Sequence, residues 1–410
     1  MGWWTAGSAI LCGALLGAAS LAGESQRAAP MDASVERWNG ATLRLFAATC
    51  SDRGAGNVGL FAPALVPALD LLAAGAAGTT REQLVAALGA PDHGGTVGRE
   101  RALRRLLGDR FDVALRAWVE ESLALREPWQ QLLTARDRYH GRVDRFALPS
   151  LDRAALAAEF NDWASEVVAE KVTVVQASDL AGPLRLVLGC ASRVEWKWVT
   201  PFDPEATAPR PFTPAASAAP PAAPIELPTM HLRHPFARFE VAGLPAVRLP
   251  CEGELALDLI RVGADVAVRD ALLARPGWLA ELDAARLQAK ERSLLVALPK
   301  LDSFTLHELV EPLRALGVTA AFDPGQADFS ALAGDAGQLF VDLVRHACGV
   351  RWDEEGGKAL GVTVVTLKRA APRDEELRFD APFLALLRGS DGAVLLAQWI
   401  ADPRGAATAR

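Results

Sequence analysis

Near its C-terminus the chain reads Trp352-Asp353-Glu354-Glu355-Gly356-Gly357 and, after a polar stretch, Phe379-Asp380-Ala381-Pro382-Phe383-Leu384-Ala385-Leu386-Leu387-Arg388. One strand-like run leads into the first segment, and another follows the polar stretch. The 23 residues from Gly356 to Arg378 show no helical period, and their tip, residues 366–376, is too charged to bury. A loop of this length inside a compact domain is uncommon and is usually functional or disordered. The pattern therefore predicts an exposed segment with a role of its own.

The composition indicates a large core and no nucleic-acid partner. Half of the 410 residues are hydrophobic, and a chain of this length forms either two domains or one large mixed domain. The formal net charge is −7. Phosphate binding needs a concentrated basic face, which this balance of charges gives no reason to expect.

Hydrophobic periodicity predicts helices and strands mixed without strict βαβ alternation, which is typical of an α+β domain. Thr79-Thr80-Arg81-Glu82 has the pattern of a capping box and predicts a helix that ends at Gly89. The proline- and alanine-rich stretch 207–228 predicts a meandering connection rather than a central strand. Further helices are predicted at 33–48, 64–75, 97–107, 151–170 and 305–316, and strands at 184–194, 236–249, 254–262, 291–301, 339–352 and 377–388.

No motif predicts an enzyme. Gly54-Ala55-Gly56-Asn57-Val58-Gly59 matches the letters of a dinucleotide fingerprint, but it follows a predicted helix, whereas the fingerprint follows a strand. Leu306-His307-Glu308-Leu309-Val310-Glu311 lacks the second histidine of a zinc-protease helix. None of the six histidines pairs with a serine or cysteine as base and nucleophile. The sequence implies no metal and no other cofactor.

Several short motifs accompany the Glu-Glu-Gly hinge and the Phe-x-x-Pro-Phe run. They are Leu298-Pro299-Lys300, Leu316-Gly317-Val318, the runs 321–330, 198–204 and 57–63, and Phe160-Asn161-Asp162-Trp163. In order and spacing the chain resembles the serpin family, the suicide inhibitors of serine proteases, over roughly residues 32–404. The resemblance implies an α+β fold with a large central mixed β-sheet, two smaller sheets, about eight or nine helices and an exposed reactive-centre loop at about 356–378.

The resemblance also implies a mechanism. A protease attacks the loop and forms an acyl-enzyme, and insertion of the cleaved loop as a new central strand then traps it; serpin loop insertion is itself a standard example of strand addition. An inserted strand needs alternate side chains that fit beneath the sheet. By the family register the inward set is Gly357, Ala359, Gly361, Thr363 and Val365, and the outward set is Lys358, Leu360, Val362 and Val364.

The inward set is small or β-branched and uncharged, which favours insertion. Against it, each glycine in a strand costs about 0.5–1 kcal/mol in conformational entropy. Leu360 and Val362 also depart from the alanine-rich pattern of the family. Slow insertion would turn an inhibitor into a substrate, because deacylation then wins. The hinge residues on which this depends are Glu354, Glu355, Gly356, Gly357, Ala359, Gly361 and Thr363.

The resemblance places a polar cluster beneath the loop that controls opening of the sheet. In this chain the sheet-opening region is predicted to contain Trp198, Cys190 and His346. The usual asparagine partner of His346 is replaced by Cys190, and two serines of the family are Ala62 and Leu65. A buried histidine without partners costs stability. We therefore expect His346 to bond a backbone carbonyl.

The sequence leaves three possible positions for the residue before the scissile bond. Counting forward from the hinge gives Ala370, and counting back from Phe379 gives Ala371. A shift of one residue gives Arg369, which would suit a trypsin-like pocket with its carboxylate, whereas alanine suits an elastase-like pocket. The predicted partner is thus a serine protease of the trypsin-like or elastase-like kind.

The first 22 residues are predicted to be a signal peptide. An apolar run from Ala9 to Ala22 ends in Ser20-Leu21-Ala22, a small-x-small cleavage pattern. No lysine or arginine precedes the run, so an uncleaved membrane anchor is the alternative, although a spanning helix needs roughly 20 apolar residues. Residues 23–410 are then predicted to form a single secreted domain, extracellular or periplasmic, and monomeric.

Four cysteines remain after removal of this segment, and their spacing does not resemble a metal site. The family resemblance places Cys190 and Cys348 on neighbouring strands of the main sheet, where a disulfide would prevent the sheet from parting. Buried thiols are the favoured interpretation, and the pairing of Cys50, Cys190, Cys251 and Cys348 stays open.

Arg101, Arg104 and Arg105 lie close to one face of the helix predicted at 97–107. Some serpins bind polyanions through the corresponding helix, so the resemblance raises a weak polyanion contact here. A solvated arginine face is the favoured interpretation.

The sequence therefore predicts a serine-type endopeptidase inhibitor that acts as a suicide substrate, and no enzyme. The alternative is a non-inhibitory binding or structural protein with the same fold, whose loop is only a substrate. The inward set favours inhibition, and the depleted polar cluster favours the alternative.

Overall fold

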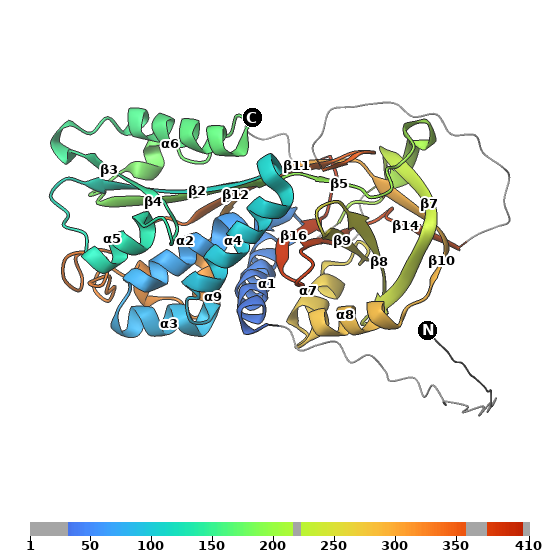
Figure 1. Ribbon diagram of the computed structural model, residues 1–410, viewed down its shortest axis with the longest axis horizontal. Coiled ribbons are helices and arrows are strands. Elements are labelled where there is room, and N and C mark those ends of the chain that lie inside the picture. The colour runs from blue at the N-terminus through green and yellow to red at the C-terminus, as the bar shows by residue number, and fades with distance from the viewer. Residues whose placement is uncertain (1–31, 216–222, 358–374, 405–410) are drawn as a thin grey trace, which may run out of the picture. The chain divides into compact units, whose positions relative to one another are not determined.

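Nine α-helices and a large mixed sheet make up the part of the chain that the computed structural model describes, which is residues 32–215, 223–357 and 375–404 (Figure 1). The chain divides into two units, and all described residues belong to the second, Met31–Arg410. The predicted signal peptide lies outside the described residues. The helices are α1 Ala33–Arg53, α2 Ala62–Gly75, α3 Gly78–Leu88, α4 His93–Leu107, α5 Glu127–Thr134, α6 Arg153–Val168, α7 Val266–Ala274, α8 Trp278–Gln288 and α9 Val310–Ala315.

The largest sheet has nine strands and is mixed because the pair β10–β14 is parallel, whereas the other pairs are antiparallel. Its order is β1-β16-β15-β9-β8-β7-β10-β14, with β6 attached to β7. The strands are β1 Val58–Phe61, β6 Ala208–Phe212, β7 Ile225–Val241, β8 Leu244–Cys251, β9 Leu255–Arg261, β10 Glu291–Pro299, β14 Glu375–Arg378, β15 Phe383–Arg388 and β16 Val394–Ile400.

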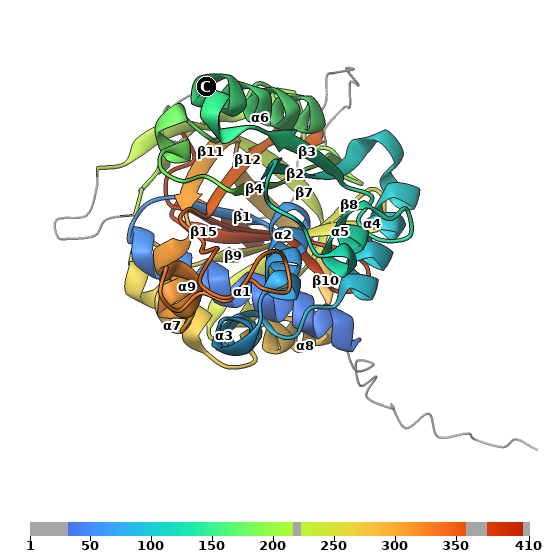
Figure 2. The same cartoon turned by 90° about the vertical axis from the view of Figure 1, so that its left-hand side faces the viewer.

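Three smaller sheets complete the described fold, one more than expected. They are the order β3-β2-β4 and the pairs β11–β12 and β13–β5. Figures 1 and 2 place α6 on one side of the layer that contains β2, β4, β11 and β12, with α1, α2 and α3 on the other side. The strands are β2 Phe111–Glu120, β3 Arg142–Phe146, β4 Leu186–Val194, β5 Trp196–Lys197, β11 Leu301–Glu308, β12 Arg345–Trp352 and β13 Gly356–Gly357.

The core is centred on β15 and β16, the C-terminal hairpin that follows the long loop. Every residue of both strands is buried, because the runs 383–388 and 394–400 are almost continuously apolar. The one charged side chain among them, Arg388, is 1 % exposed and donates to Asp283 at 2.7 Å. A buried charge survives only when it is paired in this way. The Phe-x-x-Pro-Phe run therefore anchors the far end of the loop in the core.

The α+β class and the number of helices are confirmed, and several local predictions were wrong. The strand predicted at 339–352 begins only at Arg345, and the strand predicted at 377–388 is divided into β14 and β15. Of the helix predicted at 305–316, residues 305–308 belong instead to strand β11, because Leu301, Ser303 and Thr305 alternate in burial with their neighbours, and only Val310–Ala315 is helical. The strand predicted at 236–249 is interrupted by a turn at Ala242 and Gly243, which both have positive φ. The stretch 207–228 contains the edge strand β6, which tolerates proline because it pairs on one side.

The predicted capping box at residues 79–82 does not form. Helix α3 begins at Gly78, and no side chain caps it. Thr80 is buried, and its hydroxyl accepts from the Asp328 amide at 3.0 Å. The Thr80 side chain, which the local pattern predicted to cap the helix, is thus used in a contact with a distant segment. Gly89 ends the helix as predicted, with φ 84°.

Candidate functional site

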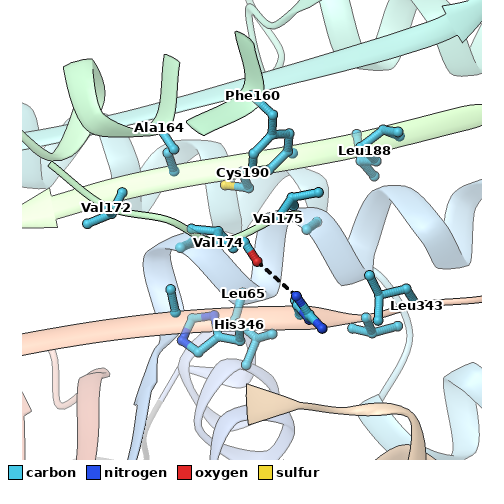
Figure 3. Close-up of a pocket in the computed structure, with 18 of the residues that line it drawn as sticks. Leu65, Phe160, Ala164, Val172, Val174, Val175, Leu188, Cys190, Leu343 and His346 are labelled. Atoms are coloured by element: carbon cyan, nitrogen blue, oxygen red, sulfur yellow. Dashed lines mark hydrogen bonds between the residues drawn. The ribbon is translucent and has the colours of Figure 1, made fainter. Parts of the chain in front are cut away.

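A slot lies between β4 and β12. Within the described residues β4 pairs only with β2, and β12 pairs only with β11, so each strand has an open edge. A cavity of about 1080 Å³ separates these edges, and α2 and α6 also contribute to its lining (Figure 3). An open strand edge presents unpaired N–H and C=O groups to any further strand. An added strand would thus find unpaired backbone groups at both edges of the slot.

The two faces of β4 are distinct. Leu188, Cys190 and Val194 pack against the main core beneath the slot. The Cys190 Sγ lies 3.8 Å from the Pro63 carbonyl oxygen at the start of α2. Ala191, in contrast, clusters with Ala164 and Val167 of α6 on the other face. Even-numbered positions of β4 thus face inward, and odd-numbered positions face α6.

The hinge enters the slot at one end. Gly356 and Gly357 form β13, which pairs antiparallel with Lys197 and Trp196 of β5 directly after β4. Gly356 has φ +150°, and a Cβ there would lie 2.6 Å from the Lys197 Cα. At Gly357 a Cβ would lie 2.5–2.7 Å from three ring atoms of Trp196. Both positions therefore require glycine, because any Cβ would overlap atoms of Trp196 or Lys197. This requirement is separate from the backbone freedom of glycine, which makes it costly in a strand.

Backbone hydrogen bonds hold the residues just before these glycines. The Trp198 amide donates to the Glu355 carbonyl at 3.0 Å, and the Phe202 amide donates to the Glu354 carbonyl at 2.8 Å. The Trp198 indole Nε1 donates to the Asp353 carbonyl at 2.9 Å. Trp198 is buried, as expected of a residue in the sheet-opening region. These bonds fix the direction in which the chain leaves β12.

The Glu354 carboxylate is the polar centre of the hinge. It lies 2.7 Å from the Lys300 Nζ and accepts from the Thr207 hydroxyl at 2.6 Å. Burial opposes its ionisation, but the hydrogen bonds from Lys300 and Thr207 outweigh burial and lower the pKa of Glu354. Glu354 is therefore a carboxylate at neutral pH, and it links β12 to the start of β11 and to the 204–208 turn.

We expect Glu354→Ala to lower the free energy of unfolding by about 1–3 kcal/mol, because two hydrogen bonds to a charged group are lost. Chemical denaturation at pH 7 measures this. The contribution is present above the ordinary glutamate pKa and is lost as the pH falls through the lowered folded pKa. Glu311→Ala is the matched control, since its exposed carboxylate only pairs with Arg314 on the same helix. An equal loss in both variants would contradict the role of Glu354.

Two histidines fasten the β11–β12 pair to β1. His346 Nε2 accepts from the Phe61 amide at 3.0 Å, and His307 Nε2 accepts from the Gly59 amide at 3.2 Å. The two histidines are also opposite each other in the β11–β12 ladder. The prediction that His346 bonds a backbone carbonyl was wrong: the ring faces a backbone donor of β1, because even-numbered residues of β12 point inward.

Burial lowers the pKa of both rings. The pKa of His346 falls to about 3, with a smaller effect from His307, and the pKa of His307 falls to about 4, with a smaller effect from Arg53. Both rings are therefore neutral at physiological pH and serve as acceptors. Sequence reasoning missed His307, although the alternation Ser303, Thr305, His307 placed it on the buried face of a strand.

All four cysteines in the described residues are free thiols. Cys190 and Cys348 lie on opposite walls of the slot rather than on paired strands, because β4 and β12 do not pair. Burial raises the pKa of the Cys348 thiol to about 12 and also raises those of Cys50, Cys190 and Cys251. The interpretation as buried thiols is thus confirmed for Cys50, Cys251 and Cys348, whereas Cys190 is half-buried.

The connection from α6 to β4 covers part of the slot. Figure 3 shows Val172, Val174 and Val175 between β4 and β12. The Arg345 guanidinium donates to the Val174 carbonyl at 3.3 Å. Arg345 also forms an ion pair with Asp179. The connection thus fills part of the space between β4 and β12.

The arginines of α4 are partly neutralised. Arg104 contacts Glu100 at 3.1 Å and Asp112 at 2.8 Å, and Arg101 donates to the Arg136 carbonyl at 3.2 Å. Arg105 is exposed. No group of three or more histidine, cysteine, aspartate or glutamate side chains within the described ranges is placed to hold a metal ion. In the same ranges no helix is long and apolar enough to cross a membrane.

The proposed reactive bond lies outside the described residues. This applies to Arg369, Ala370 and Ala371, and to the hinge residues Ala359, Gly361 and Thr363. The described hinge residues, Glu354 to Gly357, meet Trp198 at one end of the slot, whereas Cys190 and His346 lie further along it. The structure adds Trp196, which sequence reasoning missed.

Comparison with known proteins agrees with this geometry. The family model described as Serpin (serine protease inhibitor) matches residues 37–403. Serpin-Z7 of Hordeum vulgare is 27% identical over 390 residues, which cover 88% of this chain and 94% of the relative. Native protease nexin-1 with heparin aligns with a TM-score of 0.74 at 20% identity, covering 90% of this chain and 99% of that one. Human thyroxine-binding globulin complexed with its ligand aligns with a TM-score of 0.76 at 17% identity, covering 90% and 98%. The chain belongs to the serpin family.

Proposed function

We propose that this protein is a secreted, monomeric inhibitor of a serine-type endopeptidase and acts as a suicide substrate. The observation that carries the proposal is the pairing of Gly356 and Gly357 with β5 at the end of the slot between β4 and β12. The hinge thus begins a strand that faces the unpaired edge of β4, while the segment 172–175 covers the far part of the slot. Cleavage of the loop would release the chain after this hinge to continue into the slot.

The pairing register supports the same proposal. If the pairing of Gly357 with Trp196 continued along β4, residue 361 of an inserted loop would come opposite Ser192 and residue 363 opposite Cys190. Directly opposite residues of an antiparallel pair lie on the same face of the sheet. Since even-numbered positions of β4 face the core, the inward set proposed from the family register, 357 to 365 in odd steps, meets the inner face. The bulkier outward set meets the α6 side.

The proposed chemistry uses the protease's own catalytic groups. The protease serine attacks the carbonyl carbon of the residue before the scissile bond, among Arg369, Ala370 and Ala371, and forms an ester while the peptide bond breaks. The released amine carries the new N-terminus of the C-terminal fragment, which stays anchored through β15 and β16. Strand insertion must precede hydrolysis of this ester for trapping to occur.

The test is to mix the chain from residue 23 to 410 with trypsin and with an elastase and to analyse the products on denaturing gels and by mass spectrometry. We expect a denaturant-resistant complex and a C-terminal fragment that begins at Ala370, Ala371 or Pro372. Trypsin with its active-site serine chemically blocked is the control and should give no complex. Clean loop cleavage without a complex, by both proteases, would favour the non-inhibitory alternative.

A weak polyanion contact at Arg101, Arg104 and Arg105 is part of the proposal only as a secondary feature. The likeness to protease nexin-1, whose structure contains heparin, supports it, while the acidic partners of Arg104 weaken it.

A further inference from the structure

Trp196 occupies an unusual position at the end of the slot. Its side chain is 4 % exposed and lines the cavity, and its backbone pairs with Gly357. Within the described residues its Nε1 has no hydrogen-bond partner. The neighbouring Trp198 differs, because its Nε1 is bonded to the Asp353 carbonyl. The two tryptophans of this segment therefore have different roles.

The indole of Trp196 fills the space that a side chain at position 357 would need. A Cβ at Gly357 would lie 2.5 Å from Cε2, 2.6 Å from Cζ2 and 2.7 Å from Cδ2 of the ring, all far inside van der Waals contact. These atoms belong to the rigid, buried body of the ring rather than to the end of a flexible chain. The overlap cannot be relieved without moving the ring or the strand.

This fit also restricts the pairing register. A slip of one residue would turn every side chain of the entering strand to the opposite face. A slip of two residues would bring either Glu355 or Ala359 opposite Trp196, and both carry a side chain where the ring leaves no room. Gly357 is the residue of the correct face that fits over the indole.

We propose that Trp196 is the positioning residue for loop insertion: its indole accepts only glycine at position 357 and so sets the register in which the loop enters the slot. The inference rests on the proposed inhibitory function. The unpartnered Nε1 of Trp196 supports it, because an entering strand brings backbone carbonyl groups along this wall of the slot, and these accept hydrogen bonds.

The experiment compares the wild type with Gly357→Ala, Trp196→Ala and the double variant. Trapping is measured as the ratio of protease complex to cleaved protein. We expect Gly357→Ala to lower this ratio by about tenfold or more, because the methyl group overlaps the ring. Placed on the Trp196→Ala background, the same change should have less than about a threefold effect, because the ring is gone. Equal losses on both backgrounds, or no loss in Gly357→Ala, would overturn the inference.

A second measurement separates this inference from the proposed function. Hydrogen exchange of the peptide that contains Gly356 and Gly357 is recorded in the uncleaved proteins, without any protease. We expect protection in the wild type, loss of protection in Gly357→Ala and its recovery in the double variant. If the wild type traps no protease but this exchange pattern holds, the proposed function fails while the fit of Trp196 to Gly357 stands. If Trp196→Ala does not fold, Trp196→Phe replaces it, with partial recovery expected from the smaller ring.

Discussion

Replacing Gly361 with arginine should abolish trapping of the target protease and leave cleavage of the loop intact. In the register that starts at Gly357 and Trp196, residue 361 comes opposite Ser192 on the inner face of the slot. Burial of an unpaired guanidinium there costs several kcal/mol. Insertion then becomes slower than hydrolysis of the acyl-enzyme, and the protein turns into a substrate.

The measurement is the ratio of complex to cleaved protein on a denaturing gel. A fall of at least roughly 100-fold is expected, since each 1.4 kcal/mol changes the partition about tenfold. Leu360→Arg is the matched control, because it adds the same charge at the neighbouring position of the outward set. We expect it to keep most of the trapping. Full trapping by Gly361→Arg, or equal losses in both variants, would show that the register or the mechanism is wrong.

Acid should destabilise the fold strongly through His307 and His346. Both rings are neutral acceptors in the folded state, with pKa values lowered by burial to about 4 and about 3. In the unfolded chain a histidine binds a proton near pH 6.5. Stability from these rings is therefore fully present above about pH 6.5 and is lost as the pH falls toward the folded pKa values, at about 1.4 kcal/mol per pH unit for each ring.

Denaturant unfolding between pH 7 and pH 4.5 measures this slope. We expect His346→Gln and His307→Gln each to reduce the slope, since an amide oxygen still accepts the β1 amide but does not titrate in this range. Exposed His140→Gln is the control and should leave the slope unchanged. An unaltered slope in the double variant His307→Gln/His346→Gln would show that other groups cause the acid sensitivity.

The local patterns that predicted the fold correctly are those whose physical cause is local. The end of α3 at Gly89 follows from glycine's access to positive φ. The apolar runs of β15 and β16 are buried wherever they pack, so their strand character is readable from composition alone. The helix predicted at 305–316 is present only as α9, Val310–Ala315, because residues 305–308 belong to β11, whose alternation becomes decisive only once β12 lies beside it.

At the candidate site, too, local sequence features were predicted, whereas contacts between distant residues were not. The hinge at Glu354 to Gly357 and the sheet-opening region at Trp198 and His346 were predicted from the sequence, and both of the latter residues are buried. The partners of those residues were not identified. Phe61 lies 285 positions from His346, and Lys300 and Thr207 come to Glu354 from separate elements. No spacing rule connects residues so far apart in the chain.

By itself, the sequence determined the family and the α+β class, because these depend on periodicity and on motifs in a readable order. Only the tertiary structure decided that β4 and β12 stand apart, that Gly357 lies over the Trp196 ring and that His346 accepts from β1. Strand pairing and close packing depend on which surfaces meet in space. Trp196 and Gly357 are 161 positions apart in the chain, so their contact can be recognised only in the folded structure.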